Sequence, residues 1–159
     1  RAEEIFAHII NHDARLGKVS AGIEGYAMLQ TATALDRQEG RRAEALQVLK
    51  KIVAQRELQG TYWGGCGLFR LALFTYNQSQ DVKQSIPLYQ QMLRQYPHHE
   101  LAELAHLYLC LDAIELKDRA LVERESRSFL ARNTKPEYRA LIQRRMEMFA
   151  KQSDETNKR

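Results

Sequence analysis

The sequence predicts an all-α protein built from pairs of helices, an α-solenoid, and three observations carry this prediction. Apolar residues recur with helical periodicity through most of the 159 residues, whereas the alternation typical of strands is almost absent. Only 8 glycines and 3 prolines are present, too few to separate many short strands. The helical segments recur at intervals in the high thirties of residues, which is typical of stacked two-helix units.

Two kinds of helix alternate along the chain. In one kind, a small or apolar residue has an apolar neighbour. A larger residue stands four positions further on, and an apolar pair follows three and four positions after that. This kind of helix is expected at 2–11, 42–55, 83–95 and 119–131. The other kind is expected between these segments, at 22–37, 66–78 and 101–116, and a final helix is expected at about 137–150. We therefore predict a single helical-repeat domain over residues 1–150. The polar end, KQSDETNKR at 151–159, is predicted to be a disordered tail.

Three turns stand at similar places between the two kinds of helix: QEGRRAEAL at 38–46, SQDVKQSI at 79–86 and LKDRALVE at 116–123. When Gly40, Gln80 and Lys117 are taken as equivalent, the intervals are 40 and 37 residues. An antiparallel helical bundle is the alternative architecture. A bundle would not require its second helices to share one hydrophobic spacing, so the pattern favours the repeat.

Two of these segments, GRRAEALQVLKKIV (40–53) and QDVKQSIPLYQQMLRQYP (80–97), resemble the turn and second helix of tetratricopeptide repeats (TPR). Ala45 and Ser85 take the small position where two helices cross, Tyr89 takes the aromatic position, and Pro97 takes the terminal proline. AEEIFAHIINH (2–12) resembles a second helix without its first. The resemblance covers about residues 1–135. It implies a right-handed α-solenoid of antiparallel helix pairs, with about three repeats, an N-terminal half repeat and a C-terminal capping helix.

The first helices depart from the family pattern. Leu73 and Cys110 stand where the family has a small residue, and the intervals exceed the usual repeat of about 34 residues. The extra residues are expected in the loops.

Tetratricopeptide arrays are, as a family, binding scaffolds whose first helices line a concave groove. Projected onto this chain, the resemblance implies a groove lined by Gln30, Thr31, Ala34, Arg37, Arg70, Leu71, Phe74, Asn77, Leu107, Tyr108 and Leu111. Aromatic and aliphatic residues beside one arginine favour an amphipathic helix or apolar peptide over the C-terminal carboxylate that chaperone-binding members grip with basic residues. The predicted function is a non-catalytic protein–protein interaction scaffold that binds a peptide, an amphipathic helix or another copy of itself.

The heptapeptide TYWGGCG at 61–67 is the stretch that most resembles a catalytic loop, with Cys66 between glycines. A nucleophile elbow needs a glycine two residues after the nucleophile, where this chain has Leu68, and it follows a strand. A catalytic cysteine also needs a histidine base, and no histidine here carries a local signature. We therefore predict that the heptapeptide connects two helices. A cysteine-dependent enzyme using Cys66 is kept as an alternative function.

A nucleic-acid-binding α-solenoid is the other alternative. The net charge is +4 with a pI near 9.1, but the basic blocks are short and interleaved with acidic residues. Nucleic-acid-binding surfaces usually gather their basic residues on one face. Nucleic acid is therefore not the expected partner.

No metal or cofactor is expected. His8 and His12 are four residues apart on one helical face and could form a metal pair, but no third ligand stands at a telling distance. The apolar runs are far shorter than a membrane span. The start at Arg1 suggests that a leader or anchor has been removed, so the compartment stays open between a bacterial envelope-associated and a cytoplasmic location.

Overall fold

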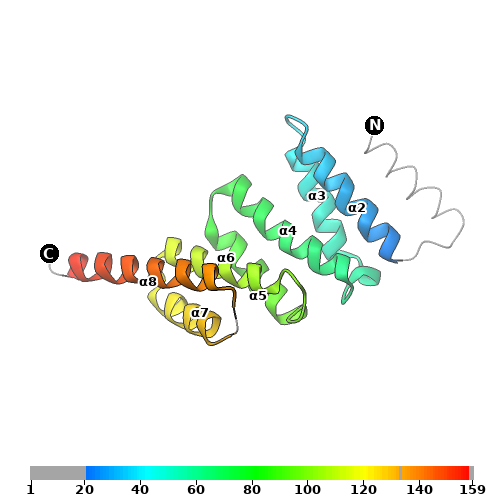
Figure 1. Ribbon diagram of the computed structural model, residues 1–159. Coiled ribbons are helices and arrows are strands. Elements are labelled where there is room, and N and C mark those ends of the chain that lie inside the picture. Colours follow the sequence, from blue (N-terminus) through cyan, green and yellow to red (C-terminus); the bar gives the residue numbers. More distant parts are fainter. Residues whose placement is uncertain (1–20, 133, 158–159) are drawn as a thin grey trace, which may run out of the picture.

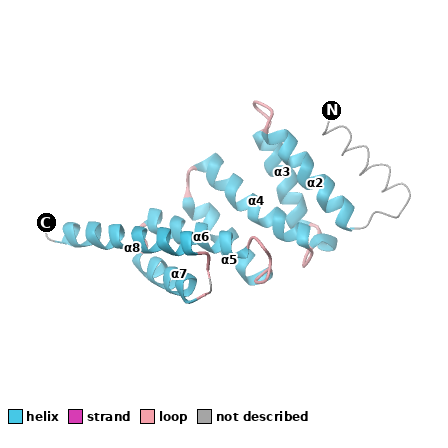
Figure 2. Ribbon diagram, in the orientation of Figure 1, coloured by secondary structure: helices cyan, strands magenta, loops and turns pink. Residues whose placement is uncertain are grey.

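The computed structural model describes residues 21–132 and 134–157, and these residues form helices joined by short turns, with no strand among them (Figure 2). The elements are α2 (Ala21–Asp36), α3 (Arg42–Ala54), the 3₁₀ turn η1 (Arg56–Leu58), α4 (Tyr62–Ser79), α5 (Val82–Gln95), α6 (Ala102–Leu116), α7 (Arg119–Ala131) and α8 (Pro136–Asn157). The all-α prediction is confirmed for this part of the chain. The expected helix at 2–11 and the His8/His12 pair lie outside it.

The helices pack in chain order. Each helix from α2 to α7 contacts the next one, α2 also contacts α4, and α8 packs on α6 and α7. Figure 1 shows this order as an elongated arrangement, with α2 and α3 toward one end and α7 and α8 toward the other. Contacts are thus mostly between neighbours in the sequence, as stacked helix pairs require. No helix in the described ranges has the length and apolar character needed to cross a membrane.

The three turns aligned in the sequence share one backbone conformation. Gly40, Gln80 and Lys117 all have positive φ, at 79°, 52° and 60°. A left-handed residue ends a helix by satisfying its last carbonyls, and glycine adopts this conformation at the least cost. In the second and third turns an aspartate follows and caps the next helix: Asp81 accepts a hydrogen bond from the Lys83 amide, and Asp118 from the Leu121 amide. The second and third turns are therefore alike, whereas in the first turn Gly40 lies four residues after the end of α2 and Arg41 makes no side-chain cap.

The second helices of the pairs also bury equivalent positions. At five, nine and twelve residues after the left-handed residue, α3, α5 and α7 each place a side chain that is almost fully buried: Ala45, Leu49 and Ile52; Ser85, Tyr89 and Met92; Val122, Ser126 and Phe129. The spacing expected from the sequence is thus the spacing that faces the core. Ala45, Ser85 and Val122 are small enough to let the neighbouring helix approach.

The start of α4 corrects the prediction for TYWGGCG. This heptapeptide is not a connection, because α4 begins at Tyr62 and Thr61 is its N-cap, accepting a hydrogen bond from the Gly64 amide at 3.2 Å. The glycines allow close packing inside the helix. A Cβ on Gly64 would collide with the Leu58 carbonyl oxygen, and one on Gly67 would collide with the Ile52 side chain.

The last helix corrects a second prediction. α8 continues to Asn157, so residues 151–157 of the expected disordered tail are helical. These residues include no glycine or proline to end the helix, and Lys, Gln and Glu are good helix formers. Low hydrophobicity indicates that this segment does not join a hydrophobic core, but a polar segment can still form a helix.

Candidate functional site

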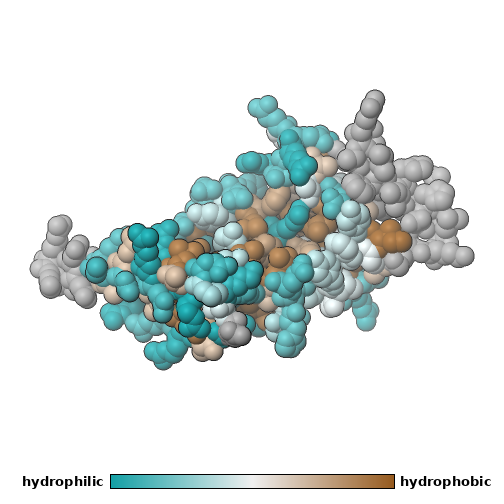
Figure 3. Space-filling view, viewed as in Figure 1, coloured by the Kyte–Doolittle hydropathy of each residue, from teal (hydrophilic) through white to brown (hydrophobic). Residues whose placement is uncertain are grey.

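A hollow lies between α4, α6 and α8, and we call it the central groove. It has a volume of about 750 Å³. Its lining residues are Leu73, Tyr76 and Asn77 of α4, Tyr89 of α5, Tyr108, Leu111, Asp112, Ile114 and Glu115 of α6, Lys117, and Arg145 and Gln152 of α8. In Figure 3, apolar residues gather in the middle of the face shown, over α4 and α6, with hydrophilic residues around them.

The groove exists because the backbones of α4 and α6 both come close to α5 and stay apart from each other, so that only side chains join the two helices. Large aromatic side chains fill the base of the space between them. The Tyr89 and Tyr108 rings are stacked with their centroids 5.9 Å apart, and Phe69 lies 6.1 Å from Tyr108. Such rings hold the helix axes apart, since the distance between packed helices follows the size of the side chains at the contact.

A buried carboxylate lies at the base of the groove. Asp112 is only 6% exposed, and its Oδ2 accepts a hydrogen bond of 2.5 Å from the Ser85 hydroxyl. Ser85 is itself fully buried at the helix crossing. Burial raises the pKa of Asp112 to about 6, because the charged form loses hydration, although the Ser85 hydrogen bond acts in the opposite direction. At neutral pH the groove therefore holds a poorly solvated negative charge.

Further polar groups line the central groove. The Tyr76 hydroxyl donates to Glu115 Oε2 at 3.1 Å and so joins α4 to α6 across the opening. This hydrogen bond to a carboxylate raises the pKa of Tyr76. Lys117 and Arg145 supply positive charge to the same lining. The groove thus combines an apolar wall, a buried acid and a rim of both charges.

The groove residues implied by the family resemblance do not all lie together. Asn77, Tyr108 and Leu111 line the central groove. Phe74 lines a smaller hollow of about 330 Å³, which Asn77 also borders. Gln30, Thr31, Arg37 and Arg70 are not among the lining residues of either space.

Several implied groove residues have internal partners instead. Arg70 donates a hydrogen bond to the Thr33 hydroxyl on α2, and Thr31 donates to the Ala27 carbonyl at 2.9 Å. Leu71 and Leu107 are buried in the core. The residues implied by the resemblance are therefore divided between the central groove, the smaller hollow and positions with internal partners.

Sequence reasoning missed Tyr76, Asp112, Ile114, Glu115 and Arg145 as groove residues. A signal for two of them was present: Asp112 and Glu115 follow Tyr108 at four and seven positions, the spacing of one helix face. Spacing alone does not place an acidic residue in a groove, because aspartate and glutamate are mostly exposed. The role of Arg145 depends on how α8 returns to α6, which periodicity alone does not determine.

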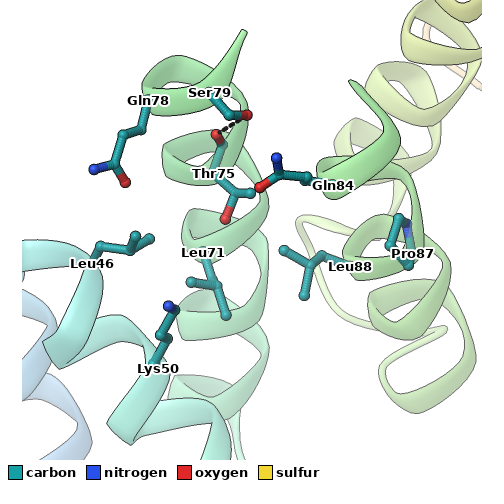
Figure 4. A pocket seen from close by; sticks show the side chains of 9 residues that line it. All are labelled: Leu46, Lys50, Leu71, Thr75, Gln78, Ser79, Gln84, Pro87 and Leu88. Carbon is teal, nitrogen blue, oxygen red and sulfur yellow. Dashed lines mark hydrogen bonds between the residues drawn. The ribbon is translucent and has the colours of Figure 1, made fainter. Parts of the chain in front are cut away.

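A second hollow, of about 410 Å³, lies between α3, α4 and α5 (Figure 4). Leu46 of α3 and Leu88 of α5 lie on either side of Leu71 of α4, and Lys50 and Gln84 line the same space. None of the described residues that line it is acidic. The two hollows therefore differ in charge as well as in size.

Cys66 lies in a defined environment that does not activate its thiol. The Leu101 amide donates to His99 Nδ1 at 3.1 Å, so the ring proton is on Nε2, which donates to the Tyr62 carbonyl at 3.0 Å. Cys66 Sγ is 3.8 Å from that same Nε2, which in this tautomer has no lone pair to accept the thiol proton. Burial raises the pKa of the Cys66 thiol. This geometry supplies neither a base nor a thiolate.

A buried histidine, His106, lies between α6 and α7. His106 is 1% exposed, and its Nε2 is 3.5 Å from Glu125 Oε2. Burial lowers the pKa of His106, which keeps the ring neutral. The ring packs edge-on against Phe129, with centroids 5.3 Å apart. Within residues 21–132 and 134–157 no group of three His, Cys, Asp or Glu residues is arranged to hold a metal ion.

A scan against protein-family models, a search of curated proteins and a search of solved structures each found no match to this chain.

Proposed function

We propose that this chain is a non-catalytic scaffold, a right-handed TPR-like α-solenoid that binds an amphipathic helix of a partner protein in the central groove. The observation that carries the proposal is the groove itself, a hollow with an apolar wall between two first helices whose backbones stay apart. Support for the solenoid comes from the left-handed turns at Gly40, Gln80 and Lys117 and from the equivalent buried positions of α3, α5 and α7.

The wall of the groove suits the apolar face of a helix. Leu73, Leu111 and Ile114 are partly buried and line the space, so each leaves some apolar surface for a ligand to cover. A helix lays side chains at i, i+3, i+4 and i+7 into such a groove. Covering this surface would remove apolar area from water, which is the main source of binding free energy.

The alternatives have less support. The groove has an acidic base, which disfavours nucleic acid. The surroundings of Cys66 disfavour a cysteine enzyme. A second copy of the chain is a possible occupant, because α8 exposes Leu141 and Met148, 37% and 45% of their surfaces, seven residues apart on one helix.

The proposal can be tested by site-specific photo-crosslinking of the full protein in its own cells. A photoreactive amino acid replaces Ile114 in the central groove or, as the matched control, Gln84 in the second hollow. We expect a discrete adduct from position 114 only, mapping by mass spectrometry to an amphipathic helical segment of another protein. Stronger adducts from position 84 would contradict the proposal. An adduct between two copies of this chain would show that the partner is a second copy.

A further inference from the structure

We propose that the helix bound in the central groove presents a lysine or arginine that enters the groove and pairs with Asp112. This inference rests on the proposed function and specifies the chemistry of the partner. It follows from the placement of Asp112 among tyrosines, and from the absence of a paired cation among residues 21–132 and 134–157.

The negative charge of Asp112 is buried with few partners to stabilise it. Among the residues that the structure describes, Ser85 alone hydrogen-bonds the Asp112 side chain, through Oδ2, and no lysine, arginine or histidine forms an ion pair with it. Buried charges in proteins are normally paired or bound to a cation, because desolvation without a partner is costly. The raised pKa of Asp112 reflects this cost. Because Asp112 also lines the groove, a cation that enters the groove can reach it.

The side chains around Asp112 suit the long stem and charged end of a basic residue. Tyr76, Tyr89 and Tyr108 line the same space, and aromatic faces attract ammonium and guanidinium groups. Leu111 and Ile114 can cover the methylenes of a lysine or arginine, as apolar surfaces do for these amphipathic side chains. Glu115 adds a second carboxylate on the same helix, held by the Tyr76 hydroxyl.

The cations of the groove itself do not fill this role. Lys117 and Arg145 line the hollow, yet neither forms an ion pair with Asp112 or Glu115. Lys117 is an exposed residue that ends α6, and Arg145 belongs to α8, across the groove from α6. Asp112 is therefore open to pairing with a cation from the partner. Lys117 and Arg145 can instead pair with acidic residues on the polar face of the bound helix.

The test uses the full chain and a display library of amphipathic helices in which one position of the apolar face is randomised. Helices selected on the wild-type protein are compared with those selected on Asp112→Asn, which retains an acceptor for Ser85 but removes the charge. Glu123→Gln is the matched control, because Glu123 is exposed on α7 and pairs with Arg119 outside the groove. Dissociation constants are then measured for a selected peptide with lysine or norleucine at the randomised position.

We expect lysine or arginine to be enriched on wild-type protein and on Glu123→Gln, and not on Asp112→Asn. Replacing the lysine by norleucine, or Asp112 by Asn, should each weaken binding about tenfold or more, and the two changes together should cost little more than either alone. Helices that bind the groove with no preference for a cation would overturn this inference and leave the proposed function standing. If no selected helix loses affinity when Leu111→Asp is introduced, the proposed function itself fails.

Discussion

The interface between α2 and α4 differs from the space between α4 and α6, although both join first helices of neighbouring pairs. α2 packs directly on α4, because Gly25 has no side chain to hold Trp63 away: a Cβ at Gly25 would lie 2.5 Å from the Trp63 Cβ. Between α4 and α6 the corresponding space is held open by Tyr89 and Tyr108. The size of a few side chains therefore decides whether two neighbouring helix pairs pack closely or leave a groove between them.

The largest effect is expected from adding a side chain at the close contact between α2 and α4. Gly25→Ala should destabilise the protein by about 2 kcal/mol, since the clash with Trp63 outweighs the better helix propensity of alanine. Urea unfolding followed by circular dichroism measures this. The matched enlargement in the groove wall, Ile114→Phe, should change the free energy of unfolding by less than about 1 kcal/mol, because the added atoms enter open space. If Gly25→Ala and Ile114→Phe lower the free energy of unfolding equally, the α2–α4 contact is no tighter than the central groove.

An intermediate effect is expected from the buried acid, and it should be stabilising. Asp112 has a folded-state pKa of about 6, above its ordinary value of 3.8, so the folded protein favours the protonated acid. Its contribution to stability is present below pH 4 and is lost as the pH rises through 6. Asp112→Asn should therefore stabilise the fold by about 1–2 kcal/mol at pH 8 and by progressively less toward pH 4. Melting temperatures at several pH values test this, and a pH-independent difference would contradict it.

Such a gain would support a functional role for Asp112, because residues placed for binding often reduce stability. The same substitution is expected to weaken cation recognition in the central groove. Stability and binding thus change in opposite directions at one position. Glu123→Gln, on the exposed surface of α7, should change neither by more than a small amount.

The smallest effects are expected at the turns. Gln80→Gly should stabilise the protein by about 0.5–1 kcal/mol, since Gln80 adopts a left-handed conformation with φ of 52°. The reverse change, Gly40→Ala, should destabilise it by a similar amount, and a Cβ there meets no atom within 4 Å. Thermal melting of the two variants compares them. Changes of the same sign would show that the two turns are not equivalent.

The sequence predicted the second helices well, because their pattern is local. Ala45, Leu49 and Ile52 recur as Ser85, Tyr89 and Met92, and each buried side follows from periodicity within one helix. The equivalence of Gly40, Gln80 and Lys117 was also visible before their backbone angles were known.

Other features depend on contacts between distant residues and could not be predicted in this way. Gly64 and Gly67 are buried because η1 and α3 approach α4, and glycine-rich sequence alone reads equally well as a loop. The central groove depends on the size of Tyr89 and Tyr108, contributed by different helices. The burial of Asp112 depends on Ser85, 27 residues away.

The most direct test of the central claim is a methyl NMR titration of the full protein with a helical peptide selected on it. The two hollows carry separate reporters: Leu73, Leu111 and Ile114 line the central groove, and Leu46, Leu71 and Leu88 line the second hollow. If the helix binds in the central groove, we expect saturable chemical-shift changes at Leu73, Leu111 and Ile114 and none at Leu46, Leu71 and Leu88. Shifts confined to Leu46, Leu71 and Leu88 would contradict the assignment of the groove as the binding surface.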